Sequence, residues 1–114
     1  ARRRDRPDVR AQASLASVEA AIGMRNQARA RIAEVVGGSY MDHHVAYSLG
    51  AALAQLGDLN ESLTWLQRAA DTGFPCYPWF ERETLLTPMR REPGFVRLLD
   101  RLRDAQAEAG RRTQ

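Results

Sequence analysis

The sequence predicts an all-α protein, and three observations carry this prediction. The hydrophobic content of 44% is rich in Ala and Leu and poor in β-branched residues, a composition that favours helices over sheets. No alternation of apolar and polar residues persists for the length of a strand. Residue size also repeats with a period of thirty-four residues. The first copy contains Leu15, Ala16, Gly23, Ala28, Ile32 and Val35, and the matching residues of the second are Leu49, Gly50, Gly57, Ser62, Leu66 and Ala69. One domain is expected for 114 residues.

Two helices, over residues 7–22 and 26–36, are expected in the first copy. Pro7 suits the first position of a helix, and Gly37 with Gly38 ends the second helix. Gly23 stands where the first helix must stop, because glycine accepts the left-handed conformation of a helix end without a Cβ clash.

The second copy predicts a helix over residues 43–56, capped by Asp42, and another that runs to about Thr72 with Gly73 at its end. Asp58 and Glu61 have the spacing of a capping box for this helix. Small residues at matching places let the helices of each pair approach, while large residues fill the space beside them. The small residues are Ala16, Ala28, Gly50 and Ser62, and the large ones are Leu15, Ile32, Leu49 and Leu66.

The period fails after residue 73. The aromatic residues Phe74, Tyr77, Trp79 and Phe80 are expected to pack the second pair against the end of the chain, with a ligand platform as the alternative. A short helix is expected over 78–83, then an irregular turn through Arg91, because Pro88 and Pro93 interrupt the pattern. A longer helix runs from Pro93 to Gly110, and its apolar stripe consists of Phe95, Leu98, Leu99, Leu102 and Ala105.

The thirty-four-residue period resembles the tetratricopeptide repeat. The resemblance implies a right-handed superhelical stack of antiparallel helix pairs, about two and a half repeats long, with a C-terminal capping helix. The repeats would occupy 9–42, 43–76 and, in degenerate form with the cap, 77–110, between a basic flexible tail at 1–6 and a tail at 111–114.

The positive charge lies at the ends of the chain. The net charge is +3, but the interval 7–110 holds eleven Arg and thirteen acidic residues, so its own net charge is −2. A nucleic-acid surface would place a basic stripe on the folded body, so we expect no nucleic-acid partner. No apolar run approaches membrane-spanning length, so no membrane contact by this segment is expected.

The sequence also argues against an enzyme. His43 and His44 are adjacent, and their side chains leave a helix about 100° apart, so we expect no shared metal. Cys76 is expected to be an ordinary thiol. No phosphate loop or catalytic carboxylate pair is recognisable, so no cofactor is expected. An enzyme or a nucleic-acid binder would depend on the His pair or the Arg-rich ends alone.

The resemblance implies a noncatalytic module that binds a peptide or partner protein on a concave face lined by the first helix of each pair. The inward positions of the repeat correspond to Arg10, Ala13, Ser17 and Ala20 in the first copy, and to His44, Tyr47, Ala51 and Ala54 in the second. The family's carboxylate clamp for acidic chaperone tails is not matched, because Ala13, Ser17, Ser48 and Pro78 stand at four of its positions and Arg82 alone fits. The alternative is a structural spacer or oligomerisation element without a peptide ligand.

Context and self-association are further expectations. The lack of an initiator Met, and of any Lys beside seventeen Arg, suggests a repeat segment of a larger bacterial regulatory or signalling protein, expected in the cytoplasm. Nothing before Pro7 looks able to cover the first pair. We therefore expect a weak symmetric homodimer through the apolar residues Val9, Leu15, Val18, Ile22, Ile32 and Val36.

Overall fold

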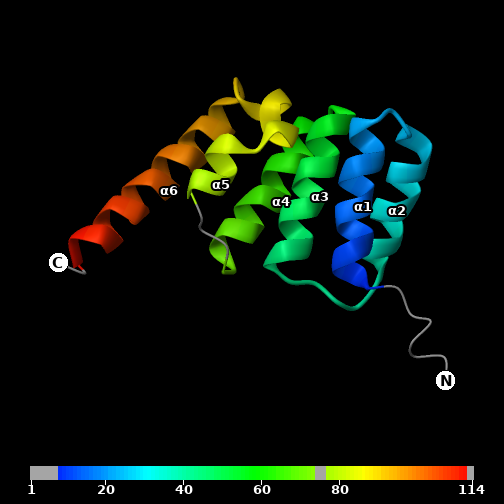
Figure 1. Ribbon diagram of the computed structural model, residues 1–114, viewed down its shortest axis with the longest axis horizontal. Helices are drawn as coiled ribbons and strands as arrows, with labels where there is room; N and C mark the ends of the chain where they lie inside the picture. Colours follow the sequence, from blue (N-terminus) through cyan, green and yellow to red (C-terminus); the bar gives the residue numbers. More distant parts are fainter. Residues whose placement is uncertain (1–7, 74–76, 113–114) are drawn as a thin grey trace.

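The computed structural model describes residues 8–73 and 77–112, and over these ranges it contains helices and no strand (Figure 1). The predicted all-α class is therefore confirmed for the described part of the chain. Its helices are α1 (Val9–Ala21), α2 (Arg25–Gly37), α3 (His43–Leu56), α4 (Leu59–Asp71), α5 (Tyr77–Arg82), the 3₁₀ helix η2 (Thr84–Met89) and α6 (Pro93–Arg112). The tails at 1–6 and 113–114, the helix-opening role of Pro7, and residues Phe74, Pro75 and Cys76 lie outside the described residues.

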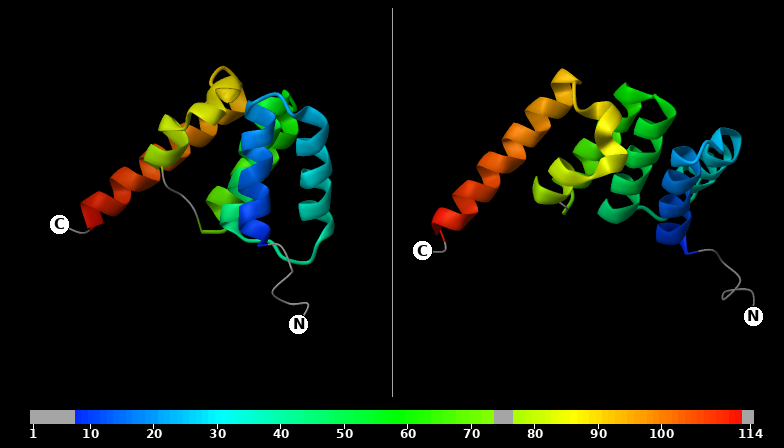
Figure 2. Two further views of the ribbon diagram at one scale, coloured as in Figure 1. Left: turned by 45° about the vertical axis from the view of Figure 1, so that its right-hand side comes forward. Right: turned by 45° about the horizontal axis from the view of Figure 1, so that its top comes forward.

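The first four helices form two antiparallel pairs that lie side by side. Helix α1 packs against both α2 and α3, and α3 packs in turn against α4. Figures 1 and 2 show α1 and α3 as neighbours, each followed by a partner that runs in the opposite direction. Two clusters of buried apolar side chains hold this arrangement, one between the two pairs and one between the second pair and the C-terminal helices.

The expected Asp42 cap at the start of α3 is confirmed, since its carboxylate accepts a hydrogen bond from the Val45 amide at 2.8 Å. Helix α1 begins at Val9, later than the expected start at residue 7, and its cap is one that the sequence did not predict: the Asp8 carboxylate accepts a hydrogen bond from the Arg10 amide at 3.0 Å. Gly23 and Gly57 have φ values of 92° and 88°, so both adopt the left-handed conformation expected where the first helix of each pair ends.

The prediction of a capping box at the start of α4 is wrong. The Asp58 side chain caps no amide of α4, and its carboxylate accepts a hydrogen bond from Arg29 Nη1 at 2.8 Å. The Asp58 amide, which Glu61 would have to accept from, donates to the Leu53 carbonyl at 3.0 Å in the turn that ends α3. Only two residues separate α3 from α4, so the turn that ends α3 already engages the Asp58 amide and leaves it no hydrogen bond to donate to Glu61.

The predicted small-residue contacts are confirmed, with an exception among the large residues. Ala16, Ala28 and Ser62 are fully buried, and a Cβ placed on Gly50 would lie 2.6 Å from Leu66 Cδ2. Leu15, expected to fill space as Leu49 does, is 41% exposed, whereas Leu49 is fully buried. The difference arises because Leu49 faces the first pair, while no described element covers the matching face of α1.

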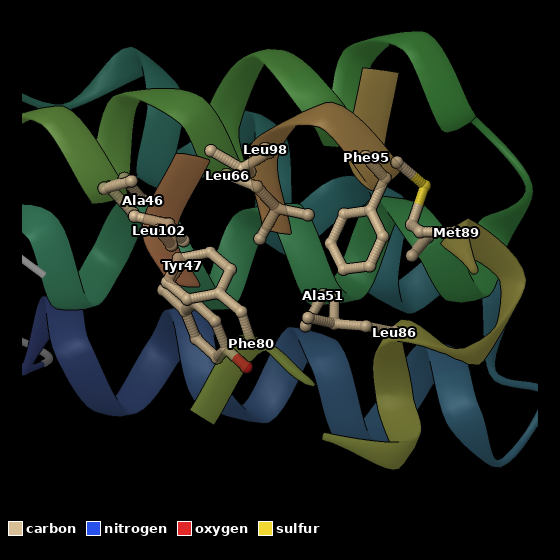
Figure 3. Close-up of a cluster of buried hydrophobic side chains, with 13 residues drawn as sticks. Ala46, Tyr47, Ala51, Leu66, Phe80, Leu86, Met89, Phe95, Leu98 and Leu102 are labelled. Carbon is tan, nitrogen blue, oxygen red and sulfur yellow. The ribbon is translucent and has the colours of Figure 1, made fainter. Parts of the chain in front are cut away.

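The C-terminal unit, which consists of α5, η2 and α6, is more regular than the sequence predicts. Residues 84–89 form the 3₁₀ helix η2, with Pro88 inside it, where an irregular turn was expected. A 3₁₀ helix accommodates this proline because so short a segment loses little when one amide donor is missing. Phe80 is fully buried and meets Tyr47 edge-on, with ring centroids 5.0 Å apart (Figure 3). The expected packing role is confirmed for Phe80 and for Tyr77, whereas Trp79 is 54% exposed.

Helix α6 covers the second pair with its first half only. Phe95, Leu98 and Leu102 are buried and Leu99 is half-buried, but Ala105 is exposed, so its place in the stripe is wrong. Arg101 lies 3.3 Å from Asp71, the last residue of α4, and the later turns of α6 lie beyond that end with exposed side chains. Gly110 does not end the helix, since α6 continues to Arg112.

Candidate binding groove

A groove with a volume of about 420 Å³ lies between the first helices of the two pairs and the C-terminal unit. Helices α1 and α3 supply its floor, and α5 with η2 supplies its wall. Its lining residues are Ser14, Ser17, His44, Tyr47, Ser48, Ala51, Trp79, Glu83 and Leu85. Three segments of the sequence, within 14–17, 44–51 and 79–85, therefore build one surface.

The floor is smooth because its side chains are small or lie flat. Ser17 and Ala51 are 5% and 2% exposed, and the Ser17 hydroxyl donates a hydrogen bond to the Ser14 carbonyl at 2.6 Å. The hydroxyl is thus satisfied within α1. Tyr47 is 7% exposed and is held by the edge of Phe80, so its ring forms a rigid part of the floor (Figure 3).

The wall is fixed by hydrogen bonds to its backbone. Arg90 donates from Nη1 to the Phe80 carbonyl at 3.1 Å and from Nη2 to the Glu83 carbonyl at 2.7 Å. Gln55 of α3 donates to the Leu85 carbonyl at 2.8 Å, which ties the wall to the floor. The Glu83 carboxylate accepts from the Leu85 amide at 3.2 Å and caps η2. The groove is therefore preformed by its scaffold.

A second hollow of about 380 Å³ lies on the outer side of the wall. It is lined by Pro78, Trp79, Arg82, Glu83 and Thr84. Trp79 and Glu83 line both hollows, so these two side chains form the ridge between them.

The site residues expected from the sequence fall into three groups. Four line the groove: Ser17, His44, Tyr47 and Ala51. Three are buried in the packed core and do not line the groove: Ala13, Ala20 and Ala54. Arg10 lies apart from the groove lining, with its Nε 2.7 Å from Asp42 Oδ2.

The Arg10 contact belongs to a polar cluster at the start of α3. Burial alone would raise the pKa of Asp42, but hydrogen bonds from the Tyr40 hydroxyl, the Val45 amide and Arg10 outweigh it and hold the pKa of this carboxyl well below its usual range. The bond to Asp42 also raises the pKa of Tyr40 and that of Arg10. These residues join the first pair to the second, which is a structural role.

Sequence reasoning missed the wall of the groove. Trp79, Glu83 and Leu85 were not among the expected binding residues, because the inward positions were taken from the repeat and these three follow the point where the period fails. The signal that pointed to them was the aromatic group itself, for which a ligand platform was the alternative interpretation. Ser14 and Ser48 each lie one helical turn from two expected positions, so helical periodicity could have identified both.

The two adjacent histidines lie at the start of α3, where His44 lines the groove. His43 and His44 do not diverge as expected, since their ring centroids are 4.3 Å apart at the start of α3. The separation of their Cβ directions does not prevent this, because rotation about the side-chain bonds swings both rings together. Over the described residues, no cluster of three or more His, Cys, Asp and Glu side chains is placed to hold a metal ion.

Comparison of the chain with protein-family models, with curated proteins and with solved structures gives no match. Within the described ranges, no helix has both the length and the apolar content required to cross a membrane.

Proposed function

We propose that this chain is a noncatalytic module that binds a peptide segment of a partner protein in the groove between α3 and the α5–η2 wall. The observation that carries the proposal is the groove itself: a preformed, mostly apolar hollow of about 420 Å³ with the half-exposed Trp79 at its rim. Exposed aromatic side chains beside an apolar hollow supply much of the binding energy in peptide recognition.

The arrangement of the first four helices supports a stack of the tetratricopeptide type. In such stacks the first helix of one pair contacts both its own partner and the first helix of the next pair. Helix α1 makes both contacts, with α2 and with α3. We infer that the repeat resemblance extends to the architecture, and that the groove lies on the inner side of a short stack that serves a larger regulatory protein.

Selection from a displayed library of random linear peptides tests the proposal. Peptides that bind the parent chain are expected to lose affinity for Ser48→Trp, which fills the groove, and for Trp79→Ala, which removes its rim. Thr64→Trp is the matched control, because Thr64 is exposed on α4 outside both hollows. Selected peptides that bind Ser48→Trp and the parent equally would show that the groove is not the binding surface.

A second candidate function is self-association through the first pair. The exposed fractions of Leu15, Val18 and Ile22 are 41%, 47% and 66%, although the residues thirty-four positions later, Leu49, Ala52 and Leu56, are 4% exposed or less. Val36 of α2 is also 46% exposed. The same positions are therefore covered in one copy and uncovered in the other, and a second chain would cover them.

A further inference from the structure

We propose that the groove selects a peptide with a basic side chain, Lys or Arg, whose cationic end lies between Trp79 and Glu83. This inference rests on the proposed peptide-binding function and names the chemistry of the ligand. It depends on how the charges of this chain are paired, on the composition of the two hollows and on the exposure of Trp79.

Three carboxylates that link neighbouring helices are paired with arginine, whereas Glu83 is not. Glu19 pairs with Arg31, Asp42 with Arg10 and Asp58 with Arg29, each at 2.7 or 2.8 Å. No ion pair joins the Glu83 carboxylate to a cation among the described residues, and its one hydrogen bond comes from the neutral Leu85 amide. The nearby guanidinium of Arg90 is directed at backbone carbonyls instead.

The charges on the two sides of the ridge decide which hollow takes the cation. Arg82 lines the outer hollow and is 82% exposed, with Glu81 3.9 Å away, so a basic ligand group would meet a like charge there. Of the described residues that line the inner groove, Glu83 is the only acidic or basic one apart from His44. A cation is therefore favoured on the inner side, where the ridge presents Glu83 without Arg82.

Trp79 supplies the second half of the cation site. An indole ring attracts a cation to its face, and more strongly where water is partly excluded. This chain already shows such a contact elsewhere, since the Arg68 guanidinium carbon lies 5.1 Å from the Trp65 ring centroid. A long basic side chain also has an apolar stem, which would lie along Tyr47, Ala51 and Leu85 in the groove.

The first part of the test is the composition of peptides selected from a random linear library against the parent chain above pH 7. We expect enrichment in Lys and Arg beside an apolar residue. Replacing the enriched basic residue by Gln in a synthesised peptide is expected to weaken binding about tenfold, which is the scale of one charge-assisted contact at a partly exposed site. Added salt is expected to weaken the parent peptide more than the Gln peptide.

The second part uses a matched pair of variants. Glu83→Gln keeps an oxygen that can accept from the Leu85 amide, so η2 keeps its cap, and it is expected to weaken the basic peptide about tenfold without changing the thermal midpoint. Glu81→Gln removes a neighbouring carboxylate that lines neither hollow, and is expected to leave binding unchanged. A synthetic acidic C-terminal peptide is expected not to bind.

The outcomes separate this inference from the proposed function. Peptides that lose binding on Ser48→Trp but show no basic enrichment, or tolerate Glu83→Gln, would overturn the cation site and leave the groove intact as a binding surface. If the selected peptides bind Ser48→Trp as tightly as the parent, or if the library yields no binder, the proposed function and this inference are both overturned.

Discussion

The hydroxyl of Ser62 donates a hydrogen bond to the backbone carbonyl of Gly50 at 2.6 Å, across the contact between α4 and α3. Both residues are buried, and they are the small residues at which α3 and α4 approach each other. The absence of a side chain at Gly50 lets the Ser62 backbone and Leu66 approach this closely. The distance between α3 and α4 is therefore set by the absence of a Cβ at Gly50.

Overpacking by the new Cβ of Gly50→Ala is expected to cost about 1–3 kcal/mol, because it would lie 2.6 Å from Leu66 Cδ2 and Leu66 is fully buried. Alanine gains about 1 kcal/mol in a helix interior, so the variant is expected to lose up to about 2 kcal/mol of the free energy of unfolding. Urea unfolding measures the change. Gly110→Ala is the control, since nothing lies within 4 Å of its added Cβ, and it is expected to stabilise slightly. A gain in the stability of Gly50→Ala as large as that of Gly110→Ala would show that the helices do not pack this closely.

The low pKa of Asp42 predicts a specific pH dependence. A carboxyl whose pKa is lower in the folded state stabilises the fold above its unfolded value, about 3.9, and this stabilisation is lost as the pH falls toward the folded value. Asp42→Asn keeps a capping oxygen but removes the charge. We expect the variant to be less stable than the parent at pH 7, and the difference to shrink at pH 3.

Urea unfolding at both pH values measures the Asp42 effect, with Asp104→Asn as the control on an exposed face of α6. The Asp104 variant is expected to match the parent at both pH values. If the Asp42 difference is the same at pH 7 and pH 3, the charge of Asp42 does not contribute to folding.

Glu19 and Arg31 occupy the positions that Leu53 and Trp65 hold thirty-four residues later. Their side chains, 7% and 25% exposed, are 2.8 Å apart, and the bond from Arg31 lowers the pKa of Glu19. Glu19→Leu alone is expected to cost about 1–3 kcal/mol, because it leaves a half-buried guanidinium without its carboxylate. The double variant Glu19→Leu with Arg31→Trp is expected to recover that loss. Chemical denaturation of both tests this, and a double variant no better than the single would contradict it.

Val18 and Val96 provide a matched test of self-association, being 47% and 43% exposed on α1 and α6. If the first pair forms a dimer, the parent and Val96→Glu have twice the monomer mass at high micromolar concentration, whereas Val18→Glu is a monomer. Static light scattering gives these masses. A monomeric parent would remove the oligomerisation role.

The helices could be predicted from the sequence, because the thirty-four-residue period places Gly50 opposite Ser62 and glycines at the ends of α1 and α3. The period assumes that every copy has a neighbour on both sides, which is why it misplaced Leu15. The capping box was predicted from the spacing of Asp58 and Glu61, which describes side chains alone. This spacing does not show that the Asp58 amide is already used by the turn before α4. The period could not predict the groove wall, because Trp79 and Glu83 belong to a segment that has no earlier copy. Only the tertiary structure brings this segment beside α3.

The wall of the groove belongs to the non-repeating end of the chain, and the side chains that hold its backbone are Gln55 of α3 and Arg90 at the end of η2, not residues of α2. Further helix pairs joined ahead of α1 would cover Leu15 and Val18 and leave the lining residues where they are. If the groove binds a peptide as proposed, the number of helix pairs and the ligand can therefore change independently. A homologous or engineered chain could be lengthened by adding pairs at one end without altering the proposed binding groove at the other.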